Sequence, residues 1–280
     1  MRAHAIGAQR ASSQRSIRRI VLALIAVVTF GLGAMANPSP ASAHSLKVVV
    51  VVGPAGSSTG NYIYNAKKYA AQARSYGAKV IEIYSPNATW SRVKTAAQDA
   101  NLLIYLGHGN GYPSPYGAFQ RYTKDGFGLN PSLGSGSYLH KYWGEYYIDR
   151  DIQMAPNAVV LFNRLCYASG NPEWGGPTPT RSTAIQRVDN YAAGFLRAGA
   201  KAVFAEAIGS LAYTIKALFK STRTMDSIFM SHPSASGARD FRFDSVRSSA
   251  YRGHMDPGTT KYHRSLVGTL TMTATSFRGG

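Results

Sequence analysis

Short runs of apolar residues alternate with longer mixed segments along most of the chain. The runs have the length of buried strands and lie at 47–52, 78–84, 101–106, 158–163 and 201–205. The segments between them predict helices near 61–76, 89–98, 181–198 and 210–230. Continuous apolar strands that alternate with helices are typical of a parallel sheet that is buried on both faces. The pattern therefore predicts an α/β fold, with a mainly parallel sheet flanked by helices on both faces.

Two regions depart from this alternation. From 110 to about 155 glycine, proline and tyrosine dominate, and a loop of this length in a compact domain is usually functional. Near the end of the chain, Leu266–Met272 alternates weakly and predicts an edge strand, whereas 233–264 has no regular pattern. We therefore expect one α/β domain over 44–232 and a C-terminal extension over 233–280 that packs on the same domain.

The first 43 residues have the organisation of an export signal. Five arginines and no acidic residue lie within the first 19 positions, 20–36 is apolar and small, and Ala41-Ser42-Ala43 fits a cleavage site. A retained membrane anchor is the alternative, but 17 apolar residues with no basic stop after them are marginal for a span. The pattern predicts a signal peptide over 1–43, a mature chain from His44, and a secreted or cell-envelope protein with no stable membrane span.

The chain is strongly basic, with a formal net charge of +18 at pH 7. Removal of the signal peptide takes away five of these charges and leaves +13. The basic residues are scattered, and no nucleic-acid-binding motif accompanies them, so we expect no specific nucleic-acid partner. A charge of this size does favour adhesion to anionic polymers such as those of a cell wall.

The chain has a single cysteine, Cys166, which follows the apolar run that ends at Phe162. The pair His108-Gly109 follows the apolar run at 101–106. Because the carboxyl ends of parallel strands meet at one edge of a sheet, this placement brings a thiol and an imidazole into one crevice. In an exported protein a cysteine without a partner is either buried as a small apolar side chain or kept for its reactivity. The polar, glycine-containing segment 163–170 around Cys166 favours reactivity.

The order of these motifs resembles the caspase-like cysteine peptidases of clan CD, a group that includes caspases, gingipains, separases and bacterial CHAT domains. The resemblance covers about 47–220 and depends on Leu106-Gly-His-Gly109, on Leu165-Cys-Tyr-Ala-Ser-Gly170 and on the segment 194–204 that follows the next helix. It implies a secreted, bacterial-type member of the group with the caspase-like three-layer sandwich.

The resemblance also implies a role for each site residue. Cys166 would be the nucleophile, His108 would transfer the proton, and the backbone N–H groups of Gly109 and Cys166 would form the oxyanion hole. Caspases themselves carry Gln-Ala-Cys-x-Gly, whereas Arg164-Leu165 precedes the cysteine here, so their preference for aspartate does not carry over. The chemistry is consistent with these roles, since imidazole exchanges protons near neutral pH and glycine allows close backbone approach.

Specificity has weaker signals. Several members of the group select a basic residue with an acidic pocket, and the candidates for one here are Glu173, Asp149, Asp151 and Glu206. Glu206 and Asp189 lie near the ends of predicted elements, where capping and surface roles are more common. The long insertion is rich in tyrosine, and Tyr112 and Trp143 are candidates for substrate contact. Packing of this loop onto its own domain is an equal alternative.

The remaining features predict no cofactor and no metal. The histidines His140, His232, His254 and His263 show no metal-ligand spacing and are expected at the surface. The glycine-rich turn 53–60 lacks the phosphate-binding spacings. An N-terminal His44 is compatible with copper binding, but the enzymes that use it are antiparallel sandwiches.

The sequence therefore predicts a secreted cysteine endopeptidase or related amide hydrolase that uses a His-Cys dyad on a peptide or protein substrate. The alternative is a catalytically inactive, envelope-associated binding protein on the same fold. The presence of both Cys166 and His108 favours the enzyme, because an inactive site has no need of either.

Overall fold

The computed structural model describes residues 45–259 and 261–279. The predicted signal peptide over 1–43 and the predicted mature terminus His44 lie outside the described residues.

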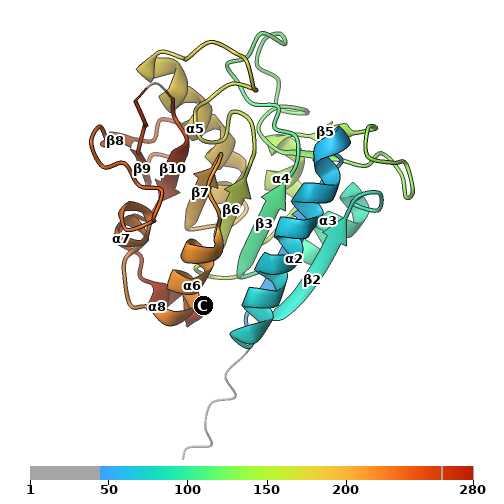
Figure 1. The fold of residues 1–280 in the computed structure, drawn as a ribbon, viewed down its shortest axis with the longest axis horizontal. Helices are drawn as coiled ribbons and strands as arrows, with labels where there is room; N and C mark the ends of the chain where they lie inside the picture. Colours follow the sequence, from blue (N-terminus) through green and yellow to red (C-terminus); the bar gives the residue numbers. More distant parts are fainter. Residues whose placement is uncertain (1–44, 260, 280) are drawn as a thin grey trace, which may run out of the picture. The chain divides into compact units, whose positions relative to one another are not determined.

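Within the described residues, eight strands form one central sheet in the order β2-β1-β3-β6-β7-β10-β9-β8 (Figure 1). Five of them are parallel: β1 (Lys47–Val52), β2 (Lys79–Tyr84), β3 (Leu102–Leu106), β6 (Val159–Asn163) and β7 (Ala202–Glu206). Three antiparallel strands complete the sheet: β10 (Arg264–Gly268), β9 (Arg252–Met255) and β8 (Phe241–Asp244).

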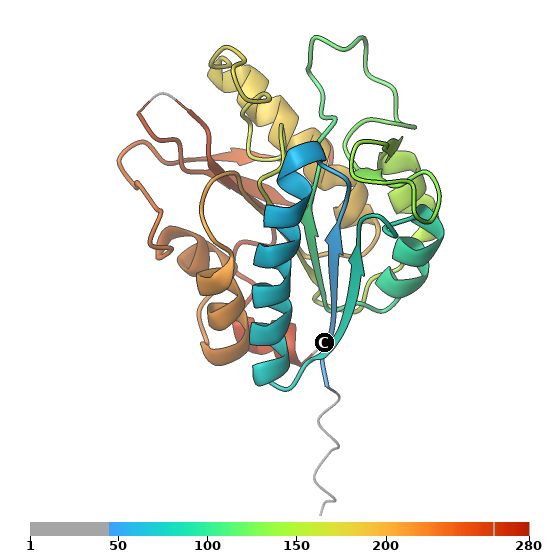
Figure 2. The same cartoon turned by 45° about the vertical axis from the view of Figure 1, so that its right-hand side comes forward.

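Helices cover both faces of the sheet. One face packs against α2 (Thr59–Ser75), α6 (Ala212–Lys220), α7 (Met225–Met230) and α8 (Ala274–Arg278), and Figure 2 shows α2 and α6 side by side on it. The other face packs against α3 (Trp90–Ala97), α4 (Glu145–Asp151) and α5 (Arg181–Arg197). A short 3-10 turn, η1 (Gly56–Ser58), precedes α2. The predicted fold class is confirmed: a three-layer α/β sandwich with a mainly parallel sheet.

The valine run of β1 explains why the parallel strands could be predicted from the sequence. Successive side chains of a strand point to opposite faces. Val49 and Val51 enter the core on the α3 and α5 side, and Val48, Val50 and Val52 enter the core on the α2 side. Since both faces are buried, every position must be apolar, and the run is continuous rather than alternating.

The insertion between β3 and β6 is more ordered than its sequence predicts. It contains an antiparallel pair, β4 (Phe127–Leu129) and β5 (Lys141–Trp143), followed by α4. Each of these strands has three residues, which is too short to show a period of two. The pair is fixed by aromatic packing, with the Trp143 ring stacked 5.2 Å from that of Trp90.

The single helix predicted over 210–230 is wrong, because α6 and α7 are separate helices. The Thr224 side chain accepts a hydrogen bond from the N–H of Ser227 and caps α7. The N–H of Met225 bonds to the carbonyl of Met272 at 2.8 Å, which turns the chain toward the C-terminal segment.

The C-terminal predictions also need correction. The predicted edge strand over 266–272 is the internal strand β10, which pairs with both β7 and β9, and 233–264 is not irregular, since it contains β8 and β9. Arg264 and Ser265 of β10 are buried, so hydropathy hides its internal position. The strands within 233–279 therefore continue the sheet begun by residues 45–232. None of the described helices is long and apolar enough to cross a membrane.

Candidate active site

The candidate site lies at the carboxyl edge of the parallel strands. Strands β3 and β6 are neighbours whose last residues, Leu106 and Asn163, stand opposite each other. His108 follows β3 by two residues, and Cys166 follows β6 by three. The topology thus places the two predicted catalytic residues on adjacent loops, where open α/β sheets form their binding crevices.

The two loops touch through Gly109. A Cβ atom added at Gly109 would lie 2.1 Å from the carbonyl oxygen of Cys166, so only glycine allows this approach. No backbone carbonyl among the described residues accepts a hydrogen bond from the N–H of Gly109 or of Cys166. Neither N–H is committed to a backbone carbonyl, so both are available as donors to an oxyanion beside the thiol.

The side chain of Tyr105, in β3, holds the loop that carries His108. The buried Tyr105 hydroxyl lies 3.1 Å from the carbonyl oxygen of His108 and accepts a 2.9 Å hydrogen bond from the N–H of Gly128 in β4. A Cβ at Gly107 would lie 2.3 Å from this hydroxyl. The loop therefore turns immediately after β3 and presents His108 at the sheet edge.

The backbone on both sides of Cys166 is left-handed, with φ of 58° at Arg164 and 69° at Tyr167. Each such non-glycine residue costs about 1 kcal/mol and persists only where the surroundings impose it. Here the N–H of Arg164 donates a hydrogen bond to the carbonyl oxygen of Glu206 at 3.0 Å. The N–H of Tyr167 donates one to the carbonyl oxygen of Asn171 at 2.8 Å. Strain of this kind is concentrated at functional sites.

A cavity of about 250 Å³ opens beside the thiol. Its walls are formed by Tyr62, Arg164, Leu165, Cys166, Asn171, Pro172, Glu173, Trp174, Ala207, Ile208, Lys261 and His263. Cys166 is half-buried, whereas Trp174 is 97% exposed and forms part of the rim. The nucleophile candidate therefore faces a space large enough for a side chain of a bound peptide.

Burial and the nearby carboxylate of Glu173 raise the pKa of the Cys166 thiol to about 11. Hydrogen bonds from the backbone amides of Cys166 and Trp174 act in the opposite direction but do not outweigh them. Burial also lowers the pKa of His108, and the neighbouring imidazole of His140 lowers it further. At neutral pH the resting pair is therefore a neutral thiol and a neutral imidazole.

His140 lies at the surface, as predicted, but the prediction that it is isolated is wrong. Its side chain is exposed, but its ring centroid lies 4.7 Å from that of His108. The Tyr142 ring packs against the other side of His140 at 4.8 Å. The two histidines are 32 positions apart in sequence, so only the folding of the insertion brings them together.

Glu173 lies where a site residue is expected. It lines the Cys166 cavity, and its carboxylate accepts hydrogen bonds from the hydroxyls of Tyr116, at 2.9 Å, and Tyr167. Burial tends to raise the pKa of Glu173, but these hydrogen bonds outweigh it and lower the pKa below the ordinary value. Glu173 is therefore ionised at neutral pH and held in place.

The other three predicted substrate-binding residues do not line this cavity. Trp143 stacks on Trp90, and Asp149 on α4 forms an ion pair with Arg197 at 2.9 Å. The ring of Tyr112 packs 5.5 Å from that of Phe119. These three residues thus pack within their own domain, which was the alternative left open by the sequence, whereas Tyr116, Tyr122 and Tyr138 of the insertion are exposed.

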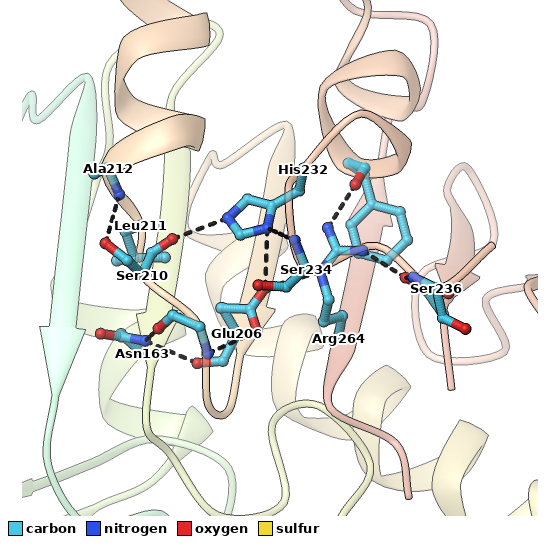
Figure 3. Close-up of polar contacts among 12 residues, drawn as sticks. Asn163, Glu206, Ser210, Leu211, Ala212, His232, Ser234, Ser236 and Arg264 are labelled. Carbon is cyan, nitrogen blue, oxygen red and sulfur yellow. Dashed lines mark hydrogen bonds and ion pairs between the residues drawn. The ribbon is translucent and has the colours of Figure 1, made fainter. Parts of the chain in front are cut away.

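The remaining acidic candidates have structural partners. Asp151 pairs with Arg150, and Asp189 accepts hydrogen bonds from the backbone N–H groups of Val246 and Arg247 at 2.8 and 3.0 Å. Glu206, at the end of β7, is buried against Arg264 at 2.8 Å, and Figure 3 shows it among satisfied polar groups. None of the three lines the Cys166 cavity.

The prediction of a surface position is wrong for His232 and His254, which are buried, whereas His263 is half-buried. His232 is buried between the carbonyl of Ser210, at 2.9 Å, and the N–H of Ser234, at 3.0 Å (Figure 3). His254 is fully buried between Asp226 and Asp240, and His263 lines the Cys166 cavity. Within 45–259 and 261–279, no three histidine, cysteine or acidic side chains gather as metal ligands would.

Comparison with known proteins gives one similarity of low score. No protein-family model matches the chain, and no curated protein matches its sequence. Among solved structures, the chain is similar to the Arg-specific cysteine proteinase gingipain R (RGPB), with 13% identity and a TM-score of 0.35. The match covers 81% of this chain and 61% of the gingipain chain.

Proposed function

We propose that the protein is a cysteine hydrolase of the caspase-like type that cleaves amide bonds in peptide or protein substrates. The observation that carries the proposal is the contact between Gly109 and the backbone of Cys166 at the mouth of a cavity. This contact joins the only cysteine of the chain to the loop of His108, at the sheet edge where such sites form.

The resting charge states favour one order of steps. Because the thiol is protonated at neutral pH, His108 must accept its proton as Sγ attacks the scissile carbonyl carbon. The S–C bond forms, the carbonyl electron pair moves to oxygen, and the N–H groups of Gly109 and Cys166 hold that oxyanion. His108 then gives the proton to the amine nitrogen as the C–N bond breaks, and water hydrolyses the thioester that remains.

We assign Glu173 a substrate-binding role in the same cavity. Two tyrosine hydroxyls hold its ionised carboxylate in place before substrate binds. Binding a cation there therefore costs little further conformational entropy of the Glu173 side chain. A cationic substrate group placed beside Glu173 would also cancel the charge that raises the pKa of the thiol. Binding and activation would then be linked.

The test is cleavage of a proteome-derived peptide mixture by the mature protein, read by mass spectrometry. We expect cleavage by wild type, loss to background in Cys166→Ser, and a loss of about 100-fold or more in His108→Ala. Equal cleavage by wild type and Cys166→Ser would exclude the thiol from the reaction.

One observation favours the second candidate, an inactive envelope-binding protein. The raised pKa of Cys166 means that the resting thiol is not activated. On that view wild type cleaves no peptide, and wild type and Cys166→Ser sediment equally with isolated cell-wall polymer. Peptide cleavage that depends on Cys166 would exclude the inactive binding protein.

The export signal is tested separately. We propose that the chain is exported and cleaved after Ala43, on the evidence of 1–43 alone. N-terminal sequencing of the protein recovered outside the cytoplasm should begin at His44. A chain that retains Met1 in the membrane fraction would support the anchor instead.

A further inference from the structure

A second hollow lies beside the Cys166 cavity and has a different character. It measures about 270 Å³, and its walls include Arg181, Arg239 and Lys261 together with the rings of Phe241 and Tyr262. No acidic residue lines it. We call it the cationic groove.

The three cations of the groove lack an ion-pair partner in the part of the chain that the structure describes. Among the described residues, no carboxylate lies within ion-pair distance of Arg181, Arg239 or Lys261. Eight other arginines of the described residues do form ion pairs. The adjacent acidic residues are committed elsewhere. Asp240 bonds to His254 at 2.8 Å, and Asp256 pairs with Arg264 at 2.6 Å.

Two of the cations are also held in position. The guanidinium carbon of Arg181 lies 3.7 Å from the centroid of the Phe241 ring, and Arg239 donates a 2.6 Å hydrogen bond to the carbonyl of Thr259. Arg181 is the first residue of the 17-residue helix α5, whose first turn has no acidic side chain. The partial positive charge of the helix end therefore adds to the groove.

The groove continues from the candidate active site. Lys261 lines both hollows, and its neighbours divide between them, with Tyr262 in the groove and His263 in the Cys166 cavity. The Lys261 ammonium also lies 6.0 Å from the ring of Trp174 on the cavity rim. An extended chain bound at Cys166 would therefore run past Lys261 into the groove.

We propose that the cationic groove is a substrate subsite that selects polypeptides with an acidic residue a short distance from the scissile bond. This rests on the proposed function, because it takes Cys166 as the reacting centre. Continuity with the Cys166 cavity favours a peptide over a free anionic polymer, and the Phe241 and Tyr262 rings provide apolar contact for the peptide backbone and side chains. Charge complementarity here sets specificity.

The first test measures binding by fluorescence anisotropy, with the mature protein carrying Cys166→Ser. The probes are fluorescein-labelled hexaglutamate and hexaglutamine. The groove variant is Arg181→Glu/Arg239→Glu, and the control is Lys79→Glu/Arg92→Glu, which makes the same charge change at exposed positions on β2 and α3. We expect hexaglutamate to bind wild type more tightly than hexaglutamine, and the groove variant to lose about tenfold in affinity while the control loses much less.

Two binding results would overturn the proposal. Equal losses in the two double variants would mean that net charge, not the groove, attracts the probe. Inorganic polyphosphate that binds wild type more tightly than hexaglutamate, and depends on the groove alone, would make the groove a polymer site.

The second test repeats the peptide-mixture cleavage with a functional Cys166. We expect acidic residues to be enriched on one side of the cleaved bonds for wild type and control, and the enrichment to vanish in the groove variant while cleavage of neutral peptides continues. Unchanged enrichment in the groove variant contradicts the subsite. If wild type cleaves nothing, the proposed function fails, and the subsite assignment fails with it even where the anisotropy shows acidic peptides in the groove.

Discussion

Two polar clusters lie at the same edge of the sheet and use the same kinds of residue, but they are built differently. The side chains of Glu206, His232 and Arg264 are buried and are bonded to one another or to neighbouring backbone groups (Figure 3). Around Cys166 and Glu173 the side chains face a cavity, and among the described residues no backbone carbonyl accepts a hydrogen bond from the N–H of Gly109 or of Cys166. Burial with satisfied hydrogen bonds is typical of a structural cluster, whereas N–H groups without a carbonyl partner beside a thiol are what the proposed oxyanion hole requires.

The comparison predicts that the first cluster controls stability. Replacement of Arg264 by Leu leaves the carboxylates of Glu206 and Asp256 buried without their partner, which should cost about 3–5 kcal/mol of unfolding free energy. The control Arg252→Leu removes an exposed pair with Asp244 and should cost less than about 1 kcal/mol. Urea unfolding measures both, and equal losses would contradict the structural role.

The second cluster should respond to a change that closes the contact between its loops. Gly109→Ala drives a methyl group into the carbonyl of Cys166, so the loops must separate and cleavage should fall about 100-fold. Gly60→Ala is the matched control, since nothing lies within 4 Å of the added carbon, and it should leave cleavage unchanged. An active Gly109→Ala variant would refute the proposed oxyanion geometry.

Removal of the Glu173 charge should have a smaller effect than Gly109→Ala, and it should make the thiol more reactive rather than less. Burial raises the pKa of Cys166 first and the charge of Glu173 raises it further, so Glu173→Gln should lower that pKa from about 11 and speed alkylation by iodoacetamide severalfold at pH 8. The same variant should bind cationic peptides more weakly. Alkylation no faster than in wild type would show that burial alone governs the thiol.

The smallest predicted effect concerns His140. Burial lowers the pKa of His108 first, and the charge of His140 lowers it further, so His140→Phe should raise that pKa while burial keeps it below the ordinary value. Phenylalanine preserves the ring contact, and His140→Lys restores the charge as a control. NMR titration of the His108 imidazole measures the shift, and no difference between Phe and Lys would remove His140 from the site.

The strands that were predicted from the sequence and the strands that were missed differ in which residues fill their buried positions. The parallel strands were predicted because burial on both faces forces apolar runs, and the catalytic candidates followed from the ends of those runs. Strand β8 was missed because none of its four residues is fully buried. Strand β9 was missed because two of its buried positions are a glycine and a histidine, with Gly253 under the Phe243 ring and His254 between two carboxylates. Hydropathy does not identify such positions.

The site shows the same division. Glu173 is near Cys166 in sequence and was found, whereas His140 reaches His108 only through the fold of the insertion. Trp143 and Asp149 were candidates because aromatic and acidic residues suit binding, but contacts with Trp90 and Arg197 occupy them. A sequence names residues capable of chemistry, and the fold decides which remain free to perform it.

The most direct test of the account is to trap the covalent intermediate on Cys166. The mature protein would be incubated with the peptide mixture, quenched in acid and digested, and the fragment that contains Cys166 weighed by mass spectrometry. We predict an acyl thioester on Cys166 in wild type, much less of it in His108→Ala, and none in Cys166→Ser. A wild-type fragment without added mass, in a sample that still cleaves peptides, would contradict the nucleophilic role of Cys166.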